Sequence, residues 1–152
     1  MRFKKFWDNT RSEEGSAALE FITAGMLLLV PVVYLVLAIS AVQGATLATE
    51  GAARHAARVY VQAASASLAT AHANLAVQAA LEDFGIPAEK ATVSVACSPN
   101  CVSPRSLVTV TVAVNVPLPL VPAVLDLDQR AVVPVSAQAS DVVSRFSAGI
   151  LR

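Results

Sequence analysis

Residues 21–42 read FITAGMLLLVPVVYLVLAISAV and contain no charged side chain. A helix needs about 20 mainly apolar residues to cross a hydrocarbon core of about 30 Å, and this run meets that length. The alternative is a buried core helix, which would normally be shorter or show a polar face. The run therefore predicts a membrane-spanning helix, which we place within residues 16–43.

The charges that flank this run predict its orientation. Arg2, Lys4, Lys5 and Arg11 precede the run, and the next basic residue after it is Arg54. Because positive charges are retained on the cytoplasmic side, we expect a single-pass protein with a cytoplasmic N-terminus and an extracytoplasmic C-terminal domain.

A secretory signal peptide is the alternative reading of the same segment. A small-x-small cleavage site is present, with Ala38-Ile39-Ser40 preceding Ala41. The apolar run is, however, well beyond the roughly 7–15 residues of a usual signal-peptide core. The length favours a permanent anchor.

Glu20 adjoins the start of the apolar run, where a carboxylate is costly and suggests a function. Alternatively, Glu20 has no function and its carboxylate reaches the lipid headgroup region, where the energetic cost of the charge is small. If the chain were cut after Gly15, the new α-amine of Ser16 would lie four residues before Glu20, about one helical turn away. Glu20 could then neutralise that amine or a neighbour's in low dielectric, and the positive end of the helix dipole would favour it in the first turns.

The segment 15–21, GSAALEF, resembles the processing motif of type IV prepilins of the Flp/Tad class. The whole layout is similar to TadE-like pilus assembly proteins, which are minor pilins or pseudopilins. The resemblance implies that a membrane prepilin peptidase cleaves between Gly15 and Ser16, and that Glu20 is the family's motif glutamate. It implies a structural subunit that works with other pilins and the Tad secretion machinery in the bacterial cytoplasmic membrane.

The rest of the chain divides into regions by composition. Residues 1–15 form the charged leader, and residues 16–43 the span. Residues 44–86 are rich in alanine, the best helix former, and predict an extracytoplasmic helical region with a break near residues 65–67. Residues 87–152 predict an extracytoplasmic sheet region.

Within the helical region, the second helix is predicted from about Ser67 to Phe84, with a stop at Gly85. Val77, Leu81 and Phe84 share one face of this helix and are expected to pack on a sheet. For Leu68 and Leu75, on roughly the opposite face, core packing is also the favoured interpretation.

Alternation of β-branched residues with period two predicts three half-buried strands. The fold class is therefore α+β: a long N-terminal transmembrane helix, a second helix and a small three-stranded antiparallel sheet. Pro134 places the third strand at an edge, because proline cannot donate to a ladder. The apolar segment 116–122 is predicted as a loop that either contacts a partner or folds back over the sheet. The alternating core positions are Val93, Val95 and Cys97; Val108, Val110, Val112, Val114 and Val116; and Val133, Val135 and Ala137.

Cys97 and Cys101 flank Ser98-Pro99-Asn100 between the first two strands. Outside the cytoplasm, such closely spaced cysteines predict a small disulfide-closed loop. A zinc site is the rival, but two thiolates without clustered histidines make a poor one. A redox C-x-x-C motif has two intervening residues rather than three.

No pattern in the sequence supports catalysis, a cofactor, a metal site or a small-molecule substrate. His55 and His72 are the only histidines and lie far apart, and phosphate-loop, nucleophile-elbow and zinc-protease motifs are lacking. The zero net charge and scarce aromatics argue against nucleic-acid binding. Two functions are left: a structural minor pilin, or a stand-alone membrane-anchored binding module outside the cytoplasm.

Overall fold

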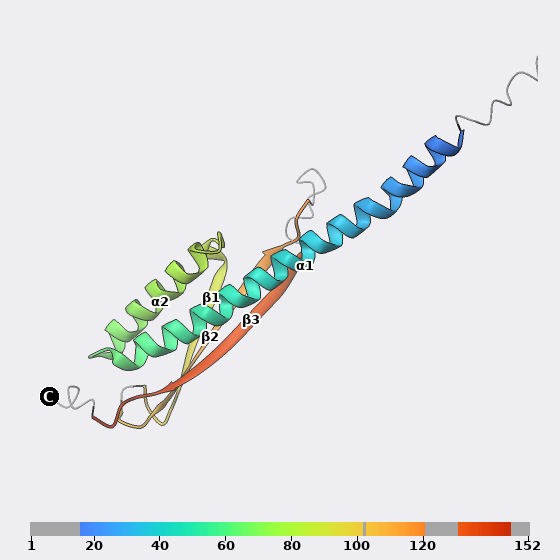
Figure 1. Ribbon diagram of the computed structural model, residues 1–152. Helices are drawn as coiled ribbons and strands as arrows, with labels where there is room; N and C mark the ends of the chain where they lie inside the picture. Colours follow the sequence, from blue (N-terminus) through green and yellow to red (C-terminus); the bar gives the residue numbers. More distant parts are fainter. Residues whose placement is uncertain (1–15, 102, 121–130, 147–152) are drawn as a thin grey trace, which may run out of the picture. The chain divides into compact units, whose positions relative to one another are not determined.

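A computed structural model describes residues 16–101, 103–120 and 131–146 (Figure 1). It confirms the predicted α+β class, with a long apolar N-terminal helix, a second helix and then a three-stranded antiparallel sheet. The elements are α1 (Ser16–Gln62), α2 (Ala66–Glu82), the 3-10 turn η2 (Ala88–Lys90), β1 (Ala91–Ser98), β2 (Leu107–Pro117) and β3 (Val132–Val142).

The chain separates into two compact units, and the division falls between Leu37 and Ala38. The division lies a few residues before the predicted boundary after residue 43, and α1 runs without a break through both positions and through Pro31. The second unit contains the remainder of α1, α2 and the sheet, and is described first.

The sheet has the strand order β1-β2-β3, with both pairs antiparallel. In its centre, Val112 of β2 lies opposite Val93 of β1 and Ala137 of β3. Alternate residues of β2 point to one face and are buried, as the period-two pattern predicts. These are Val108, Val110, Val112, Val114 and Val116.

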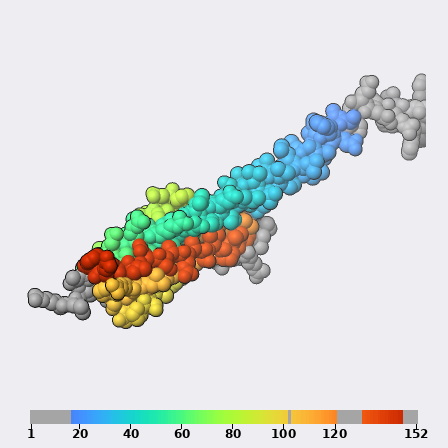
Figure 2. Space-filling model, turned by 60° about the horizontal axis from the view of Figure 1, so that its bottom comes forward, coloured from blue at the N-terminus to red at the C-terminus, as the bar shows by residue number. Residues whose placement is uncertain are grey.

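The predicted cover of this valine face by the second helix is present, and α1 adds to it. The stretch of α1 from Ala45 to Tyr60 shares one hydrophobic core with α2 and the three strands. Figure 2 shows β3, in red, alongside the green half of α1. The buried side chains of α1 are Ala45, Ala48, Ala52, Ala53, Ala56, Ala57 and Tyr60, joined by Thr49.

Alanine at these positions has a packing consequence. A methyl side chain keeps the helix backbone close to its neighbours, so that the larger valines of β2 fill the space between helices and sheet. Leu81 of α2 is the largest of the fully buried side chains. The core therefore depends on many small contacts and on a few larger anchors.

The ends of α2 are defined by local hydrogen bonds. The Ser65 side chain accepts a bond from the backbone N–H of Leu68, which is a normal N-cap. Gly85 has a φ of +69°, and the N–H of Ile86 donates to the carbonyl of Leu81, so the chain leaves the helix at the predicted glycine, although the last helical residue is Glu82.

Two predictions about this helix are wrong. Phe84 lies beyond the last helical residue and is 54% exposed, whereas Val77 and Leu81 are buried as expected. Leu68 and Leu75 are also exposed rather than packed in the core. The buried face of α2 is formed instead by Ala69, Ala73, Ala76, Val77 and Leu81.

The sheet edges and the following loop agree in part with the prediction. Pro134 lies in β3, which is an edge strand as expected. Val116 and Pro117, assigned to a loop from sequence, instead continue β2, where they pair with Val133 and Val132. The rest of the predicted loop, from residue 121 onward, lies outside the described residues.

Leu81→Ala is expected to lower the free energy of unfolding by about 2–5 kcal/mol, because it leaves a cavity in the core. The matched control Leu75→Ala removes the same atoms from an exposed position and should change stability by only about 0.5 kcal/mol. Urea unfolding of the detergent-solubilised protein, followed by circular dichroism, measures both. Equal losses for the two variants would contradict the packing described.

Candidate functional site

The N-terminal unit presents an uncovered apolar helix surface. The helix has a mean hydropathy of 2.6 over its most apolar window, and none of that window is buried. Phe21 is 80% exposed and Leu28 is 72% exposed. The segment is long and apolar enough to cross a membrane, and no described residue covers its most apolar window.

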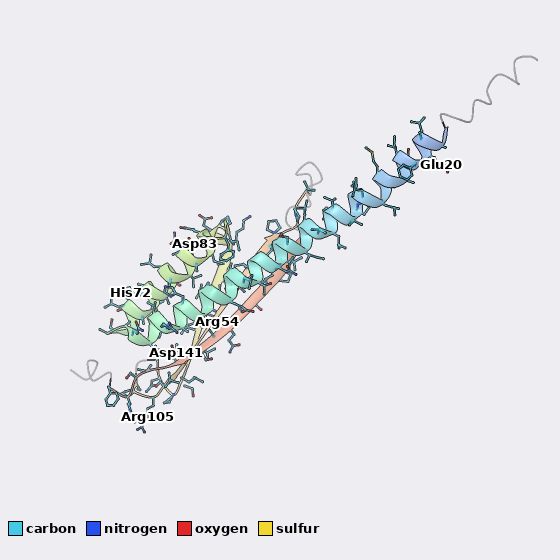
Figure 3. All side chains as sticks on the ribbon, in the orientation of Figure 1. Glu20, Arg54, His72, Asp83, Arg105 and Asp141 are labelled. Carbon is cyan, nitrogen blue, oxygen red and sulfur yellow. A yellow bond between two sulfur atoms is a disulfide. The ribbon has the colours of Figure 1, made fainter. Side chains whose placement is uncertain are left out.

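Glu20 projects from this helix as an isolated carboxylate (Figure 3). Within the described residues, no cationic side chain lies within ion-pair distance of it. None of the first-turn residues of α1 is acidic, so Glu20 lies just beyond the turn where the helix dipole acts most strongly. The helix dipole therefore stabilises the Glu20 carboxylate less than expected for a residue of the first turn.

A shallow, open groove of about 490 Å³ runs along one face of α1 and is lined by five residues of that helix alone: Leu19, Glu20, Thr23, Ala24 and Leu27. The Thr23 hydroxyl donates to the carbonyl of Leu19 at 2.7 Å, so the helix itself satisfies that polar group. Among the described residues that line this groove, Glu20 is the only charged one. Such a groove can accept a partner that brings a positive charge and covers the leucines.

The predicted cleavage site adjoins this groove along the chain. Ser16 is the first residue of α1, and Gly15 lies outside the described residues. Between Ser16 and Glu20 the chain is helical, which separates their backbones by about 6 Å along the axis. The predicted spacing of about one helical turn between Ser16 and Glu20 is therefore present. Cleavage between Gly15 and Ser16 stays a prediction.

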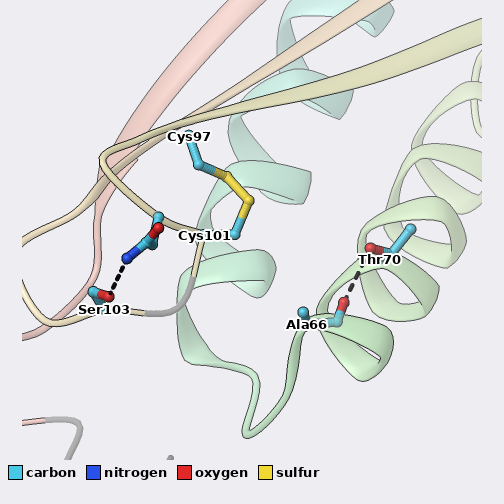
Figure 4. Close-up of a disulfide and its surroundings, with 6 residues drawn as sticks. Ala66, Thr70, Cys97, Cys101 and Ser103 are labelled. Atoms are coloured by element: carbon cyan, nitrogen blue, oxygen red, sulfur yellow. Dashed lines mark hydrogen bonds between the residues drawn. A yellow bond between two sulfur atoms is a disulfide. The ribbon is translucent and has the colours of Figure 1, made fainter.

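The two cysteines form the predicted disulfide (Figure 4). The bond joins Cys97, in β1, to Cys101, with a Cα–Cα distance of 4.9 Å. In the adjoining turn, the Asn100 side-chain amide donates to the Ser103 hydroxyl at 3.2 Å. The loop is thus tied to the end of β1, where it covers part of the core.

The remaining polar candidates behave as surface groups. His55 and His72 are exposed, and the described part of the chain contains no group of three potential metal ligands. Arg54 and Arg58 are exposed, and Arg54 forms an ion pair of 3.0 Å with Glu50 one turn earlier. Both arginines therefore lie on the solvent-facing side of α1.

One further feature was not foreseen from sequence. Glu82 of α2 and Glu89 of η2 line a common groove with the start of β1. Glu82 and Glu89 lie close together because the chain reverses direction between α2 and β1. The sequence pattern of either element alone does not predict that proximity.

The chain was compared with protein-family models, with curated proteins and with solved structures, and no match was found in any of the three.

Replacing both cysteines by serine is expected to lower the free energy of unfolding by about 2 kcal/mol, the chain-entropy value for so short a loop. Because the loop adjoins the core without filling it, the sheet should persist. Urea unfolding of the oxidised, reduced and serine-substituted proteins measures the effect. A reduced protein as stable as the oxidised one would contradict it.

Proposed function

We propose that this chain is a structural subunit, a TadE-like minor pilin or pseudopilin that takes part in assembly of a Tad/Flp-type (type IVb) pilus. One observation carries the proposal: a lone carboxylate, Glu20, lies in an apolar groove near the start of a long, uncovered helix. A simple anchor has no need of a charge at that position.

In this proposal a prepilin peptidase cuts between Gly15 and Ser16. The leader carries Arg2, Lys4 and Lys5 and stays on the cytoplasmic side, so the mature protein is a single-pass protein of the bacterial cytoplasmic membrane. Its sheet unit lies outside the cytoplasm, where the Cys97–Cys101 disulfide is stable.

Glu20 then acts on the new α-amine. When helices of several subunits pack together, the amine of Ser16 enters low dielectric and requires a counter-charge. Glu20 supplies it, either to its own Ser16 one turn away or to the Ser16 of a neighbouring subunit seated in the groove. The uncovered leucines beside Glu20 provide the apolar contact that excludes water from this pair.

Glu20→Ala is expected to leave the protein cleaved and inserted in the membrane but to reduce pilus assembly strongly. The physical reason is an unpaired buried amine, which costs about 3–5 kcal/mol when fully buried. The matched control is Glu50→Ala, which removes an exposed carboxylate farther along the same helix. Electron microscopy of surface pili and co-purification with other pilins measure the effect.

Normal pili and normal co-purification in Glu20→Ala cells would contradict the assembly role. The stand-alone membrane-anchored binding module would then be the better account of the chain. A loss of pili in Glu50→Ala cells equal to that in Glu20→Ala cells would likewise contradict a specific role for Glu20.

A further inference from the structure

The two edges of the sheet are protected differently. β3 carries Pro134 and Asp141, and a proline or a charge on an edge strand discourages the addition of another strand. β1 is the other edge, and from Ala91 to Ser98 it contains neither a charged residue nor a proline. Beyond Ala91, the described residues show no backbone hydrogen bond from β1 to any element except β2.

A groove of about 420 Å³ lies beside the start of this free edge, where Ala91 and Val93 line it. Its floor is apolar: Val77 of α2 is buried, and Ala91 and Val93 of β1 are half-buried. Its outer wall is one polar face of α2, formed by Asn74, Gln78 and Glu82. An extended chain beside β1 would therefore meet apolar surface below and amides and a carboxylate alongside.

The spacing of that wall suits a strand. Asn74, Gln78 and Glu82 follow one another at intervals of four residues, about 6 Å along the helix axis. Side chains on one face of a strand repeat about every 6.8 Å. The repeat along the wall is therefore similar in length to the repeat along one face of a strand.

The charge of the groove selects the partner. Glu82 and Glu89 both line it, and Asp83 lies at the same end of α2 (Figure 3). The Gln78 side-chain amide donates to Glu82 at 2.8 Å and holds that carboxylate at the groove. Lys90 is the only lysine or arginine within residues 74–93.

We propose that the groove between α2 and the free edge of β1 binds an extended segment of a partner protein, which carries a basic side chain and adds to the sheet as a fourth strand. Backbone hydrogen bonds to β1 supply the attachment, and the Glu82 and Glu89 carboxylates select the basic residue. This site is independent of Glu20 and of the pilus-assembly proposal.

A labelled peptide tests the proposal on the full chain in detergent micelles. The probe is an eight-residue peptide of alternating threonine and valine with one central arginine, and its binding is followed by fluorescence anisotropy. We expect saturable binding that weakens with salt, and slower amide hydrogen exchange along β1. Replacing the arginine of the peptide by glutamate should abolish binding.

Variants of the protein distinguish the effect of the carboxylate charge on peptide binding from an effect on folding. Glu82→Gln with Glu89→Gln should weaken binding about tenfold, in keeping with the loss of two partly exposed charge contacts. Glutamine preserves the shape of the wall and can still accept from Gln78. The matched control Glu50→Gln removes an exposed carboxylate of α1 and should bind the peptide normally.

N-methylation of the peptide tests strand addition. Methyl groups on alternate amides block one backbone edge of the peptide, so one of the two alternate patterns should abolish binding while the other is tolerated. No saturable binding up to millimolar peptide, equal binding of the arginine and glutamate peptides, or tolerance of both methylation patterns would overturn the proposal. Self-association of the chain that the peptide displaces would also overturn it, in favour of a second copy as the occupant.

Discussion

One uninterrupted helix, α1, has to satisfy two different surroundings. From Ala45 to Tyr60 its alanine face is buried against the sheet and α2, whereas the apolar residues before Leu37 have no protein cover within the described chain. Apolar surface of that extent cannot remain in water, so it requires lipid or other helices. The change of surroundings falls near the division between Leu37 and Ala38, where the chain separates into its two compact units.

The fold was largely predictable because its signals are local. Alternating valines marked the strands, and Gly85 marked the end of α2. The buried face of α1 was missed because alanine is equally suited to exposed and buried helix positions, so its pattern carries little contrast. Leu68 and Leu75 were assigned to the core because they are large and apolar, but they lie on the face of α2 opposite to buried Val77 and Leu81.

The candidate site was predictable only in part. The spacing of Ser16 and Glu20 is a property of one helix, and the disulfide joins two cysteines four positions apart, so both could be inferred from sequence. The groove of Glu82 and Glu89 could not, because it is formed by a chain reversal and by a strand edge whose exposure depends on strand order. Features of this second kind require the tertiary arrangement, and they belong to the sheet unit rather than to the apolar helix.

The central claim is that Glu20 serves a new α-amine at Ser16, which exists only if the leader is removed. Intact-mass spectrometry of the protein purified from its native membrane tests this most directly. The account predicts a chain that begins at Ser16 and retains the whole of α1. An uncut chain that begins at Met1, or a chain that begins at Ala41 after removal of the apolar segment, would contradict it.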